Sequence, residues 1–124
     1  NILIEQLNEA RIENDLRPLR VDLLLTIAAI NRAKDMSERN YFSHTSPDGI
    51  EWWTWISKLY YFRYAGENLA IRFTDYNNIV PAWLASPAHR KNILNPNFTE
   101  TGLGVIGNLV VQEFAKPNLF FKFF

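Results

Sequence analysis

The chain has 124 residues, of which 48% are hydrophobic and 15% are aromatic, so it can bury a core of the size expected for one domain over residues 1–124. Thirteen basic and thirteen acidic residues cancel, and no run of like charge stands out, which argues against binding to nucleic acid. The absence of cysteine excludes disulfides, thiol catalysis and zinc-thiolate sites.

The apolar runs of the chain are short. None approaches the roughly 20 residues that a membrane-spanning helix needs, so we predict no membrane span. A helical pattern starts almost at Asn1, with no signal-peptide pattern before it. We therefore expect that a signal peptide or a longer precursor was removed.

Two helices are predicted at the start of the chain. Leu3, Leu7 and Ala10 recur at helical spacing until the turn-rich residues 13–19, "ENDLRPL". Asp22 is then expected to cap a second helix over residues 23–40. We predict that the buried stripe of this second helix is formed by Leu23, Ile27, Ile30, Ala33 and Met36, widened by Leu24 and Ala28.

Shorter helices are predicted in the middle of the chain. After the turn "SPDG", the spacing of Trp53, Ile56 and Leu59 or Tyr60 indicates a third helix. Thr74 is expected to cap a fourth helix, whose apolar face comprises Ile79, Val80, Trp83 and Leu84. Pro81 lacks a backbone N–H, so it should kink this helix or displace its start.

A fifth short helix is predicted over residues 88–94. Ser86 and Pro87 form a helix-start pair, a capping oxygen followed by a residue without an N–H. His89 then lies in the first turn of this helix.

The pattern changes to that of strands beyond Asn97. Residues 99–106 and 109–115 flank Gly107 and Asn108, a pair suited to a hairpin turn, and residues 68–73 are expected to add another strand. Helices before and between antiparallel strands indicate an α+β domain whose sheet is covered by helices. The tail "NLFFKFF" is interpreted as a final strand or flap on the core, in preference to an exposed patch that binds a partner or a bilayer.

Three ionisable side chains lie in constrained surroundings. His44 precedes a Pro-Asp-Gly turn, Glu67 follows Gly66, and His89 follows Ser-Pro. Taken alone they are a weak signal, because histidines in loops and glutamates beside glycine are usually solvated.

Five ordered motifs carry a resemblance to a known family. "YFSHTSPDG", "YAGENLA", "AWLASPAHRKNIL", "TGLGV" and "VVQEFA", in that order, closely resemble the bacterial, SCP-like branch of the CAP superfamily, named for cysteine-rich secretory, antigen 5 and pathogenesis-related 1 proteins. The resemblance implies an α-β-α sandwich with a small antiparallel sheet between helical layers. It also implies secretion or display at the cell surface.

The resemblance also implies a cleft. Family members share one lined by two histidines and acidic residues, which His44, Glu67 and His89 match. In the eukaryotic branch a second glutamate lies three residues after a tryptophan, and counting from Trp83 puts Ser86 there. A second acid is therefore expected to be missing from the cleft.

Two imidazoles and a carboxylate are a known ligand set for zinc or non-haem iron, so His44, His89 and Glu67 are candidate metal ligands. We regard a divalent metal such as zinc as optional, with no cofactor required. The helix dipole at His89 disfavours its imidazolium form, which suits a ligand and a structural histidine alike. Asn68 and Ser43 are candidates for supporting hydrogen bonds, or equally for capping their own backbone.

The first functional hypothesis is an extracellular binding module, without enzymatic activity, for a small apolar ligand such as a lipid, an envelope component or a protein. The aromatic residues that line a groove in this hypothesis are Trp52, Trp53, Trp55, Tyr60, Tyr61 and Phe62, of which about half are expected to be ordinary core.

The alternative is a metal-dependent hydrolase with a cation on His44 and His89 and Glu67 as the base, the one candidate catalytic residue. A serine hydrolase using Ser86 is less favoured, because no nucleophile-elbow motif surrounds this serine. A structural or adhesive surface domain with a vestigial cleft is a third hypothesis.

Overall fold

The structure is a computed structural model that describes residues 1–119. Its helices and strands follow one another as α1 (Ile2–Glu13), β1 (Arg20–Val21), α2 (Leu23–Glu38), α3 (Trp53–Ser57), β2 (Phe62–Ala70), the 3₁₀ turn η1 (Tyr76–Asn78), α4 (Ile79–Ala85), α5 (Pro87–Ile93), β3 (Glu100–Ile106) and β4 (Leu109–Pro117). The predicted tail residues Phe120 to Phe124 lie outside the described part of the chain.

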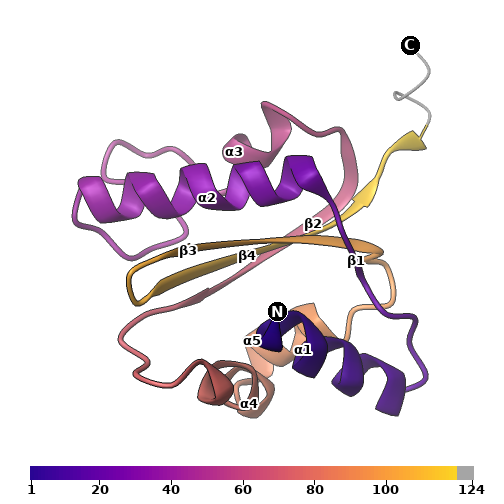
Figure 1. Ribbon diagram of the computed structural model, residues 1–124. Coiled ribbons are helices and arrows are strands. Elements are labelled where there is room, and N and C mark those ends of the chain that lie inside the picture. The colour runs from indigo at the N-terminus through magenta and orange to yellow at the C-terminus, as the bar shows by residue number, and fades with distance from the viewer. Residues whose placement is uncertain (120–124) are drawn as a thin grey trace.

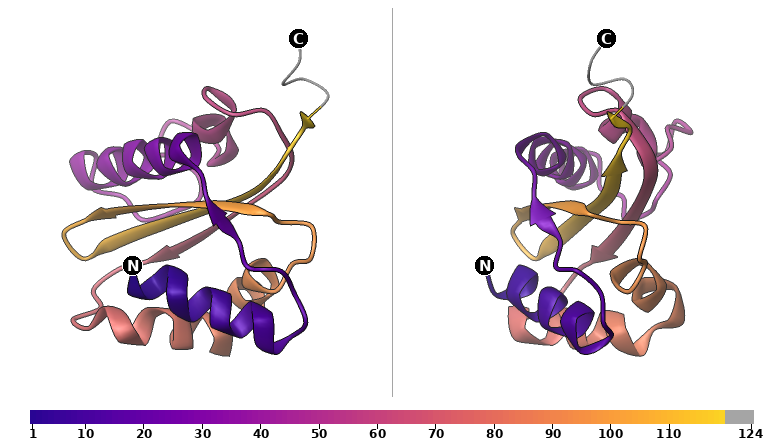
Figure 2. Two further views of the ribbon diagram at one scale, coloured as in Figure 1. Left: turned by 45° about the vertical axis from the view of Figure 1, so that its right-hand side comes forward. Right: turned by 90° about the vertical axis from the view of Figure 1, so that its right-hand side faces the viewer.

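Two helical layers enclose one four-stranded sheet, as Figure 1 shows. The helices α2 and α3 cover one face, and α1, α4 and α5 cover the other, an arrangement that the turned views of Figure 2 also show. The strand order is β1-β3-β4-β2, so β2 is an edge strand. The predicted α+β sandwich is confirmed, and the core lies on both faces of its sheet.

The hairpin predicted around Gly107 and Asn108 is confirmed as the centre of the sheet. Its strands β3 and β4 pair antiparallel, and Gly107 adopts a φ of 59°, which a glycine tolerates without a steric penalty. The strand expected over residues 68–73 instead covers Phe62–Ala70 and pairs antiparallel with β4. The two residues of β1, which pair in parallel with β3, are too short to leave a periodic signal.

The buried face of α2 differs from the predicted stripe. Asp22 caps the helix as predicted, but Leu23 is 72% exposed, and Leu24 and Ile27 are exposed as well. The side chains that α2 buries are Leu25, Ala28, Ala29, Arg32, Ala33 and Met36.

Two glycines explain this choice of face. A Cβ at Gly102 would lie 2.2 Å from the backbone of Leu25, and one at Gly104 would lie 2.4 Å from the backbone of Ala29. The helix thus touches β3 almost backbone to backbone, so alanines fit the contact and large aliphatic side chains are displaced to its flanks.

The starts of the fourth and fifth helices need corrections. Thr74 does not cap α4; Asp75 caps the 3₁₀ turn, and α4 begins at Ile79 with Pro81 in its first turn. This is the displaced start that proline imposes, since its missing N–H is harmless there. Ser86 stands at the N-cap position of α5, but its side chain makes no capping hydrogen bond.

The aromatic segment around α3 divides between core and surface. Tyr60 is buried, whereas Trp53 and Tyr61 are exposed. The remaining three, Trp52, Trp55 and Phe62, are half-buried. Among residues 1–119, no helix is long and apolar enough to cross a membrane.

Candidate functional site

Adjacent residues of the edge strand β2 reach opposite faces of the sheet. A Cβ at Gly66 would meet Phe98 and Asn92, so this position faces the layer that contains α5. Because side chains alternate along a strand, Glu67 points to the α2 layer and Asn68 points back toward α5. The two neighbouring residues Glu67 and Asn68 of the "YAGENLA" motif therefore contact the helical layers on opposite faces of the sheet.

Glu67 is the centre of a buried ion pair. The Arg32 guanidinium donates to both of its oxygens at 3.2 Å, and neither side chain is exposed to solvent. The other donors of Arg32 go to the Ser43 carbonyl at 2.5 Å and to the Tyr41 hydroxyl at 3.0 Å. Arg32 thereby fixes the loop that carries His44.

His44 completes this network from the surface. Its Nδ1 lies 2.9 Å from Glu67 Oε1, while its side chain is 52% exposed. Burial alone would raise the pKa of Glu67, but hydrogen bonds from Glu113 and His44 and the charge of Arg32 outweigh burial and hold the pKa below its ordinary value. Glu67 is therefore an ionised acceptor that orients the imidazole.

A second carboxyl lies beside Glu67. Glu113 is its direct cross-strand partner on β4 and is fully buried. Neither of its oxygens receives a hydrogen bond from a protein donor among the described residues. Burial and the negative charge of Glu67 raise the pKa of Glu113 well above its ordinary value, which favours a protonated carboxyl that donates to Glu67.

His89 forms a separate pair with Ser86. Its Nδ1 lies 2.8 Å from Ser86 Oγ, which explains why this serine does not cap α5. The imidazole stacks on Trp83, with ring centroids 6.3 Å apart. Burial and the nearby charge of His44 lower the pKa of His89, so its ring is neutral at neutral pH.

Amide side chains tie the two pairs together. Asn68 donates to the His89 carbonyl at 3.1 Å, and Asn92 donates to the Glu67 carbonyl and to Asn68 Oδ1. Asn68 thus takes the supporting role foreseen for it, whereas the Ser43 hydroxyl accepts from the backbone of Thr45, a local turn contact. The structure therefore connects His44, Glu67, Ser86 and His89 through β2.

The residues present do not fit a three-ligand metal site. Both oxygens of Glu67 are taken by Arg32 and His44, and among residues 1–119 no group of three His, Cys, Asp or Glu side chains is arranged to hold a metal ion. The Nε2 atoms of His44 and His89 provide two ligands, whereas a catalytic zinc site has three from the protein. Metal binding by the two histidines stays a prediction.

Sequence reasoning missed Arg32 and Glu113, although both left a signal. Arg32 lies on the face of α2 that also carries Leu25, Ala28 and Met36, at helical spacing. Glu113 follows Gln112 between two apolar runs of its strand, residues 109–111 and 114–115. A charged residue on a buried face generally needs a partner, and here each finds it in Glu67.

The expectation that a second acid is missing from the cleft stays a prediction. Ser86, the position that the resemblance matches to the eukaryotic glutamate, bonds His89. The second carboxyl comes from β4 and lies beneath Glu67, out of reach of solvent.

Comparison with known proteins identifies the family. The model of the CAP, or cysteine-rich secretory protein, family matches residues 4–114. The Bacillus subtilis protein YkwD is 38% identical over 115 residues, which cover 90% of this chain and 45% of YkwD. The chain thus spans less than half the length of this relative.

Solved structures agree with this match. An extracellular protein containing an SCP domain from Bacillus anthracis is 36% identical with a TM-score of 0.84, over 89% of this chain and 37% of that protein. An outer surface protein from Borrelia burgdorferi is 28% identical with a TM-score of 0.86, over 94% of this chain and 91% of that protein. On the evidence of its motifs, its sandwich fold and these matches, the chain belongs to the CAP family of cysteine-rich secretory proteins.

Proposed function

We propose that this domain is an extracellular recognition module, without enzymatic activity, that binds a polar component of the cell envelope at His44 and His89. The observation that carries the proposal is the commitment of Glu67 to Arg32. A carboxylate that is fully buried, ionised and shared between a guanidinium and an imidazole holds the site in shape. It is not free to take a proton from a substrate or from water.

The exposed groups of the site favour a ligand with hydroxyl or amide groups. The Nε2 atoms of His44 and His89 remain for hydrogen bonds, and the Ser86 hydroxyl lies 2.8 Å from Nδ1 of His89. The apolar neighbour Trp83 is buried beneath His89. This arrangement supports an envelope polymer rather than a small apolar ligand or a lipid, since ring nitrogens and a hydroxyl recognise directional partners.

A metal-dependent hydrolase receives less support from the same geometry. It needs a free base, and Arg32 lowers the basicity of Glu67. A serine hydrolase would need an acid on the histidine that contacts the serine. Here Ser86 contacts His89, whereas Glu67 contacts His44, so nucleophile and acid belong to different imidazoles.

The comparisons support an extracellular location. The Bacillus anthracis neighbour is described as an extracellular protein and the Borrelia burgdorferi neighbour as an outer surface protein. Secretion or surface display of this chain, and the partners of any longer protein that contains it, belong to the proposal.

Co-sedimentation with purified peptidoglycan tests the binding site. We expect the wild-type domain to sediment with it and the His44→Ala/His89→Ala double variant to lose most of the retained protein, because two lost hydrogen bonds weaken the affinity by about an order of magnitude. A Lys34→Ala variant, changed at an exposed position of α2, is the matched control and should sediment like wild type.

Three results would contradict the proposal. Equal sedimentation of the double variant and wild type would remove the histidines from the binding site. Cleavage of a peptide library that zinc stimulates and Glu67→Gln abolishes would show a hydrolase. Retention on phosphatidylglycerol vesicles without retention on peptidoglycan would replace the polar envelope polymer by a lipid.

A further inference from the structure

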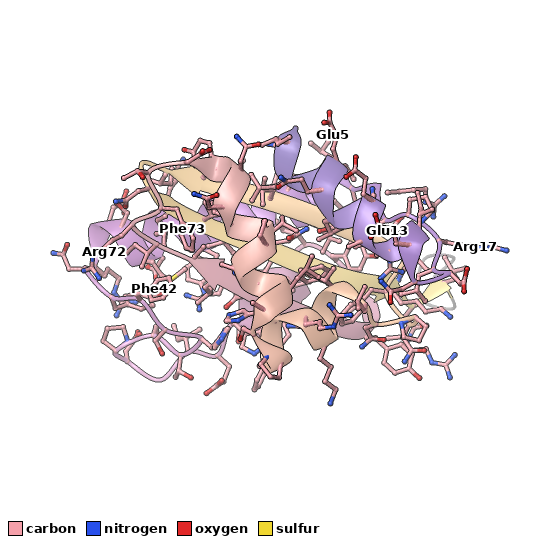
Figure 3. The ribbon with its side chains drawn as sticks, turned by 90° about the horizontal axis from the view of Figure 1, so that it is seen from below. Glu5, Glu13, Arg17, Phe42, Arg72 and Phe73 are labelled. Carbon is pink, nitrogen blue, oxygen red and sulfur yellow. The ribbon has the colours of Figure 1, made fainter. Side chains whose placement is uncertain are left out.

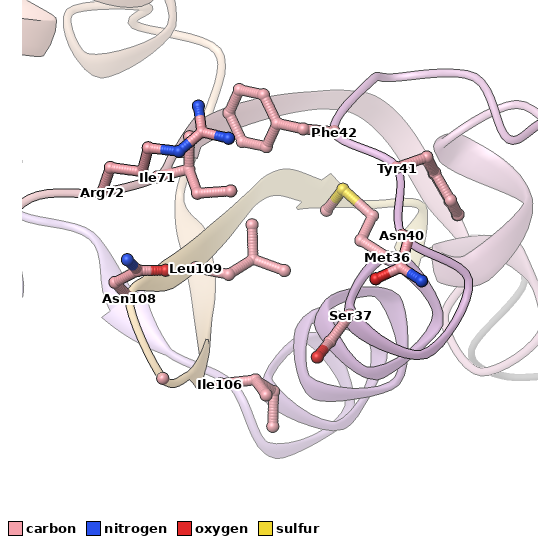
Figure 4. Close-up of a pocket in the computed structure, with 11 residues that line it drawn as sticks. Met36, Ser37, Asn40, Tyr41, Phe42, Ile71, Arg72, Ile106, Asn108 and Leu109 are labelled. Atoms are coloured by element: carbon pink, nitrogen blue, oxygen red, sulfur yellow. The ribbon is translucent and has the colours of Figure 1, made fainter.

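A second recess lies away from the two histidines. A hollow of about 520 Å³ is bounded by the end of α2, the β3–β4 turn and the segment that follows β2 (Figure 4). Its floor is apolar and includes Met36, Ile71 and Leu109. The volume falls within the range of about 300–1,000 Å³ typical of small-molecule sites.

The rim of the hollow carries one uncompensated charge. None of its eleven lining residues is acidic, and Arg72 is the one charged residue among them. Within residues 1–119, the Arg72 guanidinium makes no hydrogen bond or ion pair, and the side-chain amides of Asn40 and Asn108 make none either. In Figure 4 Arg72 and Asn40 lie at opposite sides of the hollow.

Three residues that line the hollow have a positive φ, and at one of them, Arg72, the backbone is strained. Asn40, Arg72 and Gly107 all line it, and their φ angles are 55°, 67° and 59°. Asparagine and glycine adopt this left-handed region readily, but an arginine there is strained because its Cβ approaches the backbone. Strain of this kind is concentrated at functional sites, and here it holds the arginine at the rim.

We propose that this hollow binds the C-terminal end of a peptide whose last side chain is apolar. The carboxylate would pair with the fork of Arg72, the terminal amide groups with Asn40 and Asn108, and the last side chain with the apolar floor. A fatty carboxylate would leave the two rim amides without partners. The inference goes beyond the proposed function, because His44 and His89 are not among the lining residues.

The probe is a pair of tripeptides, N-acetyl-Gly-Gly-Leu with a free carboxylate and the same peptide with a C-terminal amide. Titrations followed by NMR should shift the methyl signals of Met36 and Leu109. The acid should bind about tenfold more tightly than the amide, because the carboxylate alone carries the charge that pairs with Arg72.

Substitution of Arg72 isolates the charge. Arg72→Asn should remove the preference for the acid and keep the fold, because asparagine tolerates a positive φ. Arg17→Asn is the matched control: Arg17 lies at the opposite end of the molecule from Arg72 in Figure 3, so the preference should persist. The His44→Ala/His89→Ala variant should also bind the acid normally, which separates this test from that of the proposed function.

Three outcomes would overturn the inference. The first is equal binding of the acid and the amide to the wild type, and the second is full retention of the preference for the acid by the Arg72→Asn variant. Octanoate could also bind as tightly as the peptide acid, which would leave no role for the rim amides and would identify a fatty carboxylate as the ligand.

Discussion

Substitutions of buried residues usually lower stability, but the raised pKa of Glu113 predicts that one substitution at this position increases it. Glu113→Gln replaces a buried neutral acid by an amide of nearly the same shape, which still donates to Glu67. We expect this variant to be more stable than wild type at neutral pH. The reason is that the unfolded wild-type chain releases the proton that the folded protein must keep.

The size of the effect follows from the direction of the pKa shift. The pKa of Glu113 is higher in the folded than in the unfolded state, so its contribution to stability is complete below the unfolded-state pKa of about 4.3 and decreases as the pH rises toward the folded-state pKa. The loss is about 1.4 kcal/mol per pH unit in that window. The advantage of Glu113→Gln should therefore grow by about 1.4 kcal/mol for each pH unit above about 4.3 over which the folded wild type keeps this proton.

Urea unfolding followed by tryptophan fluorescence at pH 5, 6, 7 and 8 measures this growth, because the free energy of unfolding of each protein is obtained at each pH. Glu13→Gln makes the same chemical change at an exposed position of α1, visible in Figure 3, and should stay close to wild type throughout. A difference between Glu113→Gln and wild type that does not change with pH would refute the assignment of the proton to Glu113.

The remaining predictions concern packing and metal. Gly102→Ala should destabilise the domain by about 3 kcal/mol in the same urea assay, because its Cβ would meet the α2 backbone at 2.2 Å; a loss below about 0.5 kcal/mol would show that α2 can move away. Arg11→Met should cost about 3 kcal/mol, since the buried guanidinium donates to the carbonyls of Arg17, Ile93, Asn95 and Phe98, and a neutral result would show that these carbonyls find water instead. Calorimetry should show that any zinc bound by wild type requires both His44 and His89 and becomes weaker as the pH falls, because protons compete for the ring nitrogens, whereas equal binding by the His44→Ala/His89→Ala variant would remove these histidines from the metal site.

Local signals in the sequence predicted most elements correctly where one residue type decides the backbone. The side chain of Asp22 caps α2, Pro81 stands in the first turn of α4, and Gly107 forms the hairpin turn. Each of these outcomes depends on one side chain or on one φ angle, so neighbours in the sequence suffice to predict it.

The face of α2 shows where local signals fail. Hydrophobicity favours Leu23 and Ile27 for the core, yet the helix buries Ala29 and Arg32 beside the correctly predicted Ala28. The deciding residues are glycines of β3, more than seventy positions away in the sequence, which let the backbones touch. Periodicity along a helix identifies an apolar stripe but contains no information on the shape of the opposing surface.

For the candidate site too, some features could be predicted from the sequence and others depended on the tertiary structure. The sequence by itself determined that two histidines and a glutamate stand on the motifs of a CAP domain, and that His89 lies in the first turn of a helix. Only the tertiary structure decided which imidazole Glu67 contacts, and that Arg32 pairs with this carboxylate while the carboxyl of Glu113 lies beside it. The physical reason is that the charge state of a buried carboxyl depends on the groups within a few ångströms, and here these come from a helix, a loop and a neighbouring strand that only folding brings together.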